Sequence, residues 1–453
     1  MTAPATERAM QAQRDPTTLA ARFAAIRALS LSLAAPLTPE DQQVQTMADV
    51  SPTKWHLAHT TWFFETFLLQ PFVADYRLFH PRYGYLFNSY YEAVGPRHER
   101  GRRGDLSRPS LGEILDYRAH ADAGMNRLLV SETSVQALAL IELGLHHEQQ
   151  HQELILMDIK HVLGCNPLAP VYVPAPPASN KRPALSQPAP LVFRDFTGGR
   201  YEIGARSEDG FCFDNETPRH AIHLIDYRLA ARPVSNGEFL EFIQDGGYRE
   251  ARHWLADGWA WLRAEGISQP LYWRRETEQA QTAGRIESWR VFTLTGERPL
   301  DPAAPVCHVS YYEADAFARW AGHRLPSEGE WEVAARSGLA GGEVETGANL
   351  LGSGQWHPTA SVPVKPVVGS QGLSQMFGDV WEWTASAYSA YPGFRPSPGA
   401  VGEYNGKFMA NQMVLRGGCA LTPPGHLRPS YRNFFYPHQR WPMTGIRLAS
   451  DGT

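Results

Sequence analysis

The feature that most limits how this chain can fold is a proline-rich segment at residues 166–190, NPLAPVYVPAPPASNKRPALSQPAP. Proline cannot continue a helix and favours extended backbone, so helical structure must stop on either side of this segment. The chain has 453 residues, which is enough for two or three domains. We therefore predict an interdomain linker at 166–190, between one domain at 16–165 and another at 191–450.

The half before the linker has the pattern of a helical domain. Ser51 and Pro52 are residue types that start helices, at the N-cap and the first helical position. Ser110 and Glu113 have the spacing of a capping box. A connection at 70–109, rich in Tyr, Arg, Gly and Pro, is long enough to suggest a functional loop. The helices predicted here, which suit a four-helix bundle, span 16–35, 52–69, 110–129 and 134–163.

The half after the linker has a different pattern. Gly, Trp, Tyr and Pro are dense, and the apparent strands are short. Only the segments at 235–245, 311–322 and 327–337 have the pattern of helices, and the last begins with a second capping box. These observations predict an α+β protein, in which a four-helix bundle precedes an irregular domain with many ordered loops.

Charge and cysteine content exclude several classes of function. The net charge is −5, so no basic field favours nucleic acid. No run of about 18 apolar residues predicts a membrane-spanning helix, and the first residues lack the apolar stretch of a secretory signal. The cysteines are too widely spaced for a disulfide framework or a zinc–cysteine site. Together these features predict a cytoplasmic protein; the cysteines are Cys165, Cys212, Cys307 and Cys419.

The strongest chemical signal is the string HHEQQHQE at 146–153, inside the predicted long helix. His147 and His151 are four residues apart, so their imidazoles project from one face of the helix and suit a divalent first-row metal. The string also contains the H-E-x-x-H spacing of zinc proteases, in which Glu148 would be the general base. A third ligand from a second helix is available in WHLAH, either His56 or His59.

These strings also resemble a known family. WHLAH and HHEQQHQE resemble the damage-inducible-B-like bundle of ergothioneine-biosynthetic sulfoxide synthases. The second half resembles the sulfatase-modifying-factor domain, which is similar to formylglycine-generating enzymes and has a C-type-lectin-like fold. The strings that carry this resemblance include FTGGRYEIG at 196–204, HRLPSEGEWEVAAR at 323–336, GDVWEWT at 378–384 and VLRGGC at 414–419. The order of the motifs along the chain is more specific than any single motif.

The resemblance implies an iron(II) enzyme that uses O2 to join the imidazole of hercynine (Nα-trimethylhistidine) to cysteine, giving hercynylcysteine sulfoxide. The iron ligands of the family match His59, His147 and His151, and its imidazole-contacting residue matches Gln150. The implied partners are small molecules, with no nucleic acid and no membrane. The oligomeric state stays open.

A tyrosine is the expected proton donor. One branch of the family places it in a Y-x-x-Y string ahead of L-R-G-G. Here Tyr404 matches the second tyrosine of that string, but Val401 replaces the first. The other branch places tyrosines in the long loop of the bundle, where this chain has Tyr90 and Tyr91. We therefore predict that Tyr90 or Tyr91 supplies the catalytic proton.

The resemblance also names candidate substrate contacts. Asn433 and Phe434 in the string RNFFYP match positions that border hercynine. Phe435 stands where the branch that uses γ-glutamylcysteine has an aspartate, so we expect free cysteine to be the preferred thiol. Arginine is the natural partner of the thiol substrate's carboxylate because its guanidinium can bind both oxygens. The candidate arginines are Arg97, Arg100 and Arg432.

Three other functions are compatible with parts of the sequence. A formylglycine-generating enzyme needs a pair of catalytic cysteines late in the domain, whereas Cys419 has no such neighbour. A lectin-like binding module would need no iron. An ovothiol-type synthase, which joins histidine to cysteine, usually carries an additional methyltransferase domain. Only four residues follow TGIRLA at 444–449 in this sequence, too few for such a domain.

Overall fold

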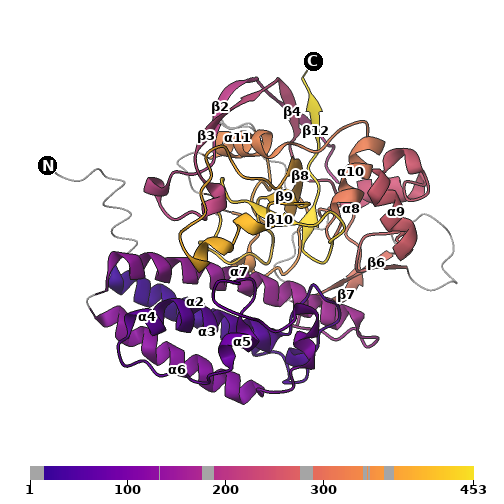
Figure 1. The fold of residues 1–453 in the computed structure, drawn as a ribbon. Helices are drawn as coiled ribbons and strands as arrows, with labels where there is room; N and C mark the ends of the chain where they lie inside the picture. Colours follow the sequence, from indigo (N-terminus) through magenta and orange to yellow (C-terminus); the bar gives the residue numbers. More distant parts are fainter. Residues whose placement is uncertain are drawn as a thin grey trace. The chain divides into compact units, whose positions relative to one another are not determined.

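The computed structural model describes residues 15–131, 133–175, 188–275, 289–339, 344, 347–361 and 372–452. The chain divides into two compact units (Figure 1). The first contains Met1–Asn166 together with two short later segments, Ala205–Thr217 and Phe394–Lys407. The second contains the rest of the chain. The first unit is helical and the second mixes short strands with helices, so the predicted α+β class is confirmed.

Four helices form the bundle of the first unit. Helices α2 and α3 both pack against α6 and α7, and their apolar faces enclose a core that includes Phe23, Phe64, Met125 and Leu145. Burial of such side chains is the main source of bundle stability, at roughly 1.5–3 kcal/mol each. The helices are α2 (Pro16–Ala34), α3 (Thr53–Phe64), α6 (Leu111–Val130) and α7 (Val135–Cys165), shown from indigo to magenta in Figure 1.

Local signals placed the helix starts well, with one exception. The capping box of Ser110 and Glu113 opens α6, as predicted, and the Ser134 side chain caps α7. The predicted start of α3 is wrong by one residue, because Pro52 is the N-cap and Thr53 is the first helical residue. Ser51 instead makes tertiary contacts. Its backbone N–H donates to Asp158 at 2.7 Å, and its hydroxyl accepts from Arg103 at 2.9 Å.

The connection between α3 and α6 is ordered. Helix α3 continues into a π-helical segment, η2 (Glu65–Leu69), and then α4 (Gln70–Phe72). The buried Glu65 carboxylate accepts hydrogen bonds from the hydroxyls of Tyr76 and Tyr117, both at 2.7 Å, which ties the start of the connection to α6. The short elements that follow are α5 (Tyr83–Phe87) and the 3-10 helix η3 (Arg100–Asp105).

The described part of the second unit contains four small sheets. Their strand orders are β1-β4-β12, β10-β9-β8-β11, β2-β3 and β5-β6-β7. In the four-stranded sheet, β9 pairs antiparallel with β8 and β10, whereas β11 runs parallel to β8. The strands are β1 (Phe193–Phe196), β2 (Gly199–Ile203), β3 (His220–Leu224), β4 (Tyr227–Ala230), β5 (Trp273–Arg275), β6 (Trp289–Thr293), β7 (Gly296–Pro299), β8 (Trp381–Ala387), β9 (Met413–Arg416), β10 (Asn433–Phe435), β11 (Thr444–Gly445) and β12 (Ala449–Asp451).

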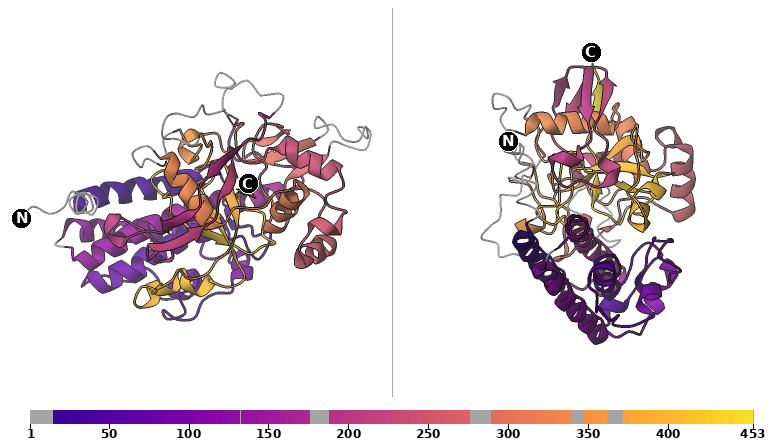
Figure 2. Two further views of the ribbon diagram at one scale, coloured as in Figure 1. Left: turned by 90° about the horizontal axis from the view of Figure 1, so that it is seen from above. Right: turned by 60° about the vertical axis from the view of Figure 1, so that its left-hand side comes forward.

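Helices of the second unit lie beside these sheets (Figure 2). The three predicted helices are present as α8 (Asn236–Gln244), α10 (Tyr311–Trp320) and α11 (Glu328–Gly338). Helix α9 (Ala256–Glu265) was not predicted, because its sequence, ADGWAWLRAE, has a low density of core-facing residues: only Gly258 and Leu262 are buried. The core of this unit includes the large side chains of Trp331, Trp381 and Trp383.

The predicted linker is only partly visible, since residues 176–187 lie outside the described residues. Before this gap, the backbone N–H groups of Tyr172 and Val173 both donate to the carbonyl of Leu294 within the second unit. No helix in the described ranges has the length and hydropathy of a membrane span.

Candidate metal centre and its surroundings

Three buried histidines meet inside the bundle. His59 projects from α3, and His147 and His151 project from α7 one turn apart. One ligand atom from each lies within 4.8 Å of the other two. The ring centroids are 4.6–5.0 Å apart. The structure therefore brings together the three histidines that the family resemblance selected, from helices that are far apart in sequence.

The hydrogen bonds of these histidines suit a metal. His59 Nδ1 donates to the carbonyl of Phe87 at 2.6 Å, which leaves Nε2 with a free lone pair. His151 uses Nδ1 to contact His56 at 2.8 Å, which again leaves Nε2. Within the described part of the chain, neither ring nitrogen of His147 has a hydrogen-bond partner. A buried imidazole with no partner is costly, and a metal ion is a chemically suitable partner.

Burial also keeps the three rings in the form that binds metals. Desolvation lowers the pKa of His147 to about 3 and holds the pKa of His59 and His151 well below its ordinary value. Neighbouring histidines lower the pKa of His59 and His151 further. All three imidazoles are thus neutral near pH 7, and only a neutral imidazole has the lone pair that coordinates a metal.

Glu148 does not have the position of a protease base. Its carboxylate accepts hydrogen bonds from Arg27 at 2.9 Å, Arg118 at 3.0 Å and Ser30 at 2.6 Å. Burial opposes the ionised form, but the two guanidinium groups outweigh it and lower the pKa of Glu148 to about 2. The carboxylate is thus a buried structural anion, which removes the zinc-protease interpretation of the H-E-x-x-H string.

We expect Glu148→Gln to destabilise the bundle by about 3–5 kcal/mol, because it leaves buried guanidinium charge without its carboxylate. Arg27 would retain Asp122 at 2.7 Å, so the loss falls mainly on Arg118. Since folding lowers the pKa to about 2, the wild-type contribution is complete above the unfolded-state value of about 4.3 and disappears as pH falls through about 2. Urea unfolding at pH 7 measures the difference.

The matched control is Asp105→Asn, which removes an exposed ion pair with Arg102. Solvent screens exposed ion pairs so strongly that they add little to stability, and this variant should therefore unfold almost like the wild type. Equal stability of the Glu148→Gln and Asp105→Asn variants would contradict the structural role of Glu148.

The predicted tyrosines have different surroundings. Tyr91 is fully buried against Trp62 and Phe67, with ring centroids 5.5 and 5.2 Å away, and its hydroxyl has no hydrogen-bond partner among the described residues. The Tyr404 ring stacks on the Tyr91 ring, with centroids 6.3 Å apart, and packs against the His147 ring, with centroids 5.5 Å apart. Tyr91 is thus separated from the histidine cluster by single aromatic rings. Burial, with smaller contributions from Glu403 and Asp214, raises the pKa of Tyr91 above its ordinary value, so its hydroxyl keeps its proton.

Tyr90 lies beside the arginines instead. The guanidinium groups of Arg97 and Arg100 lie 5.6 and 5.7 Å from its ring centroid, a cation–π arrangement. Arg97 also pairs with Glu92 at 2.9 Å, and Arg100 donates to the carbonyl of Asp49. The structure thus places both candidate arginines next to Tyr90.

One carboxylate holds the two tyrosine-bearing segments together. Glu403 accepts the backbone N–H groups of Glu92 and Ala93, both at 2.8 Å, and pairs with Lys407 at 2.8 Å. This contact joins the loop after Tyr91 to the residue before Tyr404. Because Glu403 lies more than 300 positions from Glu92 and Ala93, the sequence carries no local signal of this arrangement.

The other predicted substrate contacts lie on α7 and in the second unit. Gln150 is half-buried on α7, next to His151. Arg432 is buried and forms a two-point ion pair with Glu328, at 2.9 and 3.0 Å, so its guanidinium already has a carboxylate. On β10, the Phe434 ring stacks on Tyr388 with centroids 4.0 Å apart, and the Phe435 ring packs against Trp441 with centroids 5.5 Å apart. The Asn433 side-chain oxygen accepts a hydrogen bond from the Phe434 backbone N–H.

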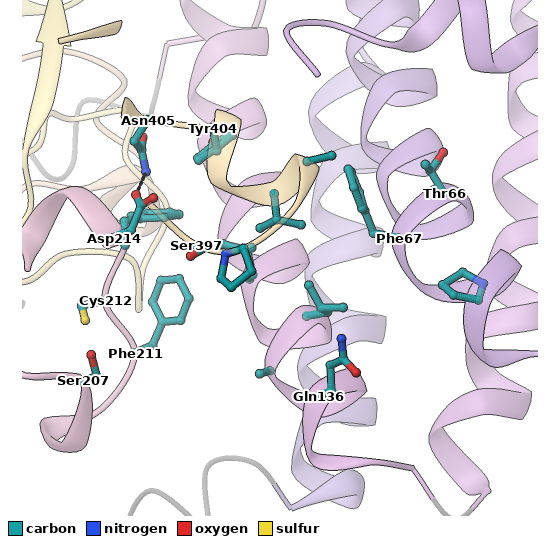
Figure 3. Close-up of a pocket in the computed structure, with 18 of the residues that line it drawn as sticks. Thr66, Phe67, Gln136, Ser207, Phe211, Cys212, Asp214, Ser397, Tyr404 and Asn405 are labelled. Atoms are coloured by element: carbon teal, nitrogen blue, oxygen red, sulfur yellow. Dashed lines mark hydrogen bonds between the residues drawn. The ribbon is translucent and has the colours of Figure 1, made fainter. Parts of the chain in front are cut away.

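A cavity of about 570 Å³ lies in the first unit beside Tyr404 (Figure 3). Its walls come from α7, the η2 segment and the two later segments of this unit, and include Phe67, Leu143 and Phe211. Asn405 donates to Asp214 at 2.7 Å on its polar side. Tyr404 therefore belongs both to the wall of this cavity and to the ring contacts of His147.

Several residues around the histidines were not predicted. Trp55 stacks on His59 with ring centroids 4.7 Å apart. The buried Arg103 guanidinium lies over the Trp55 ring, 3.4 Å from its centroid. Asp158 contacts His56 at 3.0 Å. A sequence signal existed for Asp158, since it lies seven residues after His151 and so faces the same side of α7.

Comparisons with known proteins agree with the two halves of the structure. The family model of the sulfatase-modifying factor enzyme 1-like domain matches residues 195–452. The model of the DinB superfamily matches residues 22–155, which contain all three clustered histidines. These are the two families that the sequence motifs resemble.

Individual relatives cover most of the chain. Hercynine oxygenase of Mycobacterium tuberculosis is 33% identical over 459 residues, which span 96% of this chain and 99% of that protein. Hercynine oxygenase of Mycolicibacterium smegmatis is 34% identical over 68% of this chain and 71% of that protein. The formylglycine-generating enzyme of Streptomyces coelicolor is 28% identical, over 56% of this chain and 87% of that protein. The first relative is similar across both units, whereas the last matches a smaller share of the chain.

Proposed function

Because the chain belongs to the hercynine oxygenase family, we propose that it is an iron(II)- and O2-dependent sulfoxide synthase that joins hercynine to cysteine. The observation that supports this most is the buried cluster of His59, His147 and His151, in which every ring has a nitrogen available for a metal. As neutral imidazoles, these three histidines would hold the iron ion.

The proposed reaction balances with O2 as the only oxidant. The carbon between the imidazole nitrogens loses a C–H bond, cysteine loses its S–H bond, and a C–S bond forms. One oxygen atom ends on sulfur as the sulfoxide, and the other leaves as water. Iron(II), when bound, would supply the activation of O2 and the electron transfer that this exchange needs.

The residues of the chain would position the substrates and move protons. The Gln150 amide can hydrogen-bond the hercynine imidazole and so fix the orientation of the ring. The buried hydroxyl of Tyr91, which keeps its proton and has no hydrogen-bond partner among the described residues, could donate a proton during the reaction. Arg97 and Arg100, which are not committed to a buried ion pair with a carboxylate, can receive the carboxylate of the thiol substrate.

The test is anaerobic loading of the full chain with iron(II), followed by hercynine, cysteine and O2. Mass spectrometry should show a product that equals the sum of both substrates, less two hydrogens, plus one oxygen. Consumption of O2 with formation of cystine only would contradict the proposed C–S bond formation. A product formed from histidine in place of hercynine would indicate the ovothiol-type alternative.

We further propose that cysteine is preferred over γ-glutamylcysteine. Phe435 offers an apolar ring, packed against Trp441, where the γ-glutamylcysteine branch has an aspartate. The γ-glutamyl arm adds an ammonium and a carboxylate, and desolvating them against an apolar side chain would cost enough for a preference of roughly a hundredfold. Equal concentrations of both thiols with saturating hercynine, analysed by mass spectrometry, measure the ratio of the products.

Two variants make this test specific. Phe435→Asp should shift the product ratio toward the γ-glutamyl compound, whereas Phe435→Leu, which keeps an apolar side chain, should retain the preference for cysteine. Mainly γ-glutamyl product from the wild type would show that Phe435 does not determine the choice of thiol.

A further inference from the structure

We propose that His56 and Asp158 form a directional hydrogen-bond chain that holds His151 in the tautomer and orientation needed to bind a metal. His56 would thus be a positioning residue rather than a ligand. The inference rests on the proposed function only in assuming that the histidine cluster binds a divalent metal. It concerns the chain's own residues and is independent of which substrates are used.

The three side chains form a continuous buried series. His56 Nδ1 lies 2.8 Å from His151 Nδ1, and His56 Nε2 lies 3.0 Å from Asp158 Oδ2. The side chains of His56 and Asp158 are each 3% exposed. Both distances are within the range of good hydrogen bonds, and no described contact interrupts the series. The contacts link α3 to α7 twice, at His151 and two turns later at Asp158.

The direction of the protons follows from what each atom can do. A carboxylate can only accept, so His56 Nε2 carries the proton in its contact with Asp158. A neutral His56 then has a lone pair on Nδ1, which accepts the Nδ1 proton of His151. That proton leaves the lone pair of His151 on Nε2, the nitrogen that is free to bind a metal. The Asp158 carboxylate therefore determines, through His56, the tautomer of His151.

Asp158 is itself held in place by the backbone. The Ser51 N–H donates to the same oxygen, Oδ2, at 2.7 Å, and the Ser51 hydroxyl accepts from Arg103 at 2.9 Å. A carboxylate that is fixed by the start of α3 can orient His56, which is one turn further along that helix. Ser51 precedes the N-cap, Pro52, so its N–H has no partner within α3 and can make this contact.

The series also explains why His56 is not itself a ligand. Both of its ring nitrogens are engaged, one by His151 and the other by Asp158. Among the clustered histidines, His59 is oriented differently, by the backbone carbonyl of Phe87. His151 is therefore the ligand whose orientation depends on side chains that a mutation can remove.

The experiment measures iron(II) affinity of the full chain, without substrates and without O2, by competition with a chromophoric chelator. His56→Ala should bind one iron per chain at saturation but with an affinity about 10–100-fold lower than that of the wild type, the usual effect of removing a residue that orients a ligand. His146→Ala is the matched control. His146 is a buried neighbour of His147 that stacks on Phe211 at 3.9 Å, so its loss should leave the affinity unchanged.

Two conservative variants separate positioning from packing. The Asn side chain can place its oxygen near the position of Nδ1, so His56→Asn should restore most of the affinity. Gln places its amide near the position of Nε2, so His56→Gln should remain weak although its volume is similar. In addition, proton NMR of the cobalt(II)-loaded protein should lose the shifted signal of the His151 N–H in His56→Ala and His56→Gln, and retain it in His56→Asn.

The outcomes are distinct. Wild-type affinity in His56→Ala, or equal affinity in the Asn and Gln variants, would overturn the positioning role. Complete loss of iron from His56→Ala at saturation would show that His56 is a ligand and would also overturn it. A wild-type protein that binds iron but makes no sulfoxide would contradict the proposed function and leave this inference intact.

Discussion

Alanine at His59, His147 or His151 is expected to abolish stoichiometric iron(II) binding while the bundle stays folded. Each ring would supply one of three protein ligands, and a site with only two imidazoles binds a divalent ion far more weakly. The three histidines lie beside a large apolar core that the substitutions leave intact. Metal analysis after anaerobic loading and gel filtration should show less than a tenth of the wild-type iron, and circular dichroism should be unchanged.

The histidines outside the cluster are the controls for this prediction. His146→Ala should retain full iron, since the ring stacks on Phe211 and contacts Arg22 rather than the cluster. His56→Ala should retain one iron per chain at saturation. Full iron occupancy in His151→Ala would refute the ligand assignment, because His151 has ring contacts with both other members of the cluster.

Tyr91→Phe is expected to lower the rate of sulfoxide formation by about 10²–10⁴-fold, the usual contribution of a positioned proton donor. Only the hydroxyl is removed, so the packing of the ring against Trp62 and Phe67 should remain and both substrates should still bind. O2 should then be diverted to oxidation of the thiol. Single-turnover assays that follow the sulfoxide by mass spectrometry, with O2 uptake recorded in parallel, measure both effects.

Tyr90 and Tyr404 are the comparison residues. Tyr90→Phe keeps the ring between Arg97 and Arg100 and should have a smaller effect. Tyr404→Phe tests whether the hydroxyl of Tyr404, whose ring contacts the His147 ring, shares the role. Unchanged sulfoxide formation in Tyr91→Phe, Tyr90→Phe and the double variant would show that the Tyr-Tyr pair of the long loop supplies no catalytic proton.

Local sequence signals were sufficient for most of the helices. The capping boxes at Ser110, Ser235, Ser310 and Ser327 satisfy free backbone N–H groups within four residues, so they act wherever the helix is placed. The start of α3 was misjudged because the Ser51 hydroxyl, a good helix cap, accepts from Arg103 instead. Helix α9 was missed because only Gly258 and Leu262 are buried in it, so its sequence lacks the apolar periodicity that predicts a helix.

The candidate metal centre could likewise be predicted from local sequence only in part. The pair His147 and His151 could be read directly from the sequence, because four residues in a helix place two rings on one face. The choice of His59 over His56 could not be derived from spacing alone and came from the family resemblance. In the structure, Asp158 occupies one ring nitrogen of His56 and His151 occupies the other, whereas the Phe87 carbonyl occupies one ring nitrogen of His59.

The composition, the helix periodicity and the order of the motifs were enough to establish the α+β class, the helical first half and the family, because these properties depend on neighbours along the chain. The arrangement of Tyr91 with Tyr404, the commitment of Arg432 to Glu328 and the contact of Asp158 with His56 depend on residues about 100 to 300 positions apart. Such contacts form only when packing closes long loops, and no local pattern of residues specifies which partner each side chain will meet.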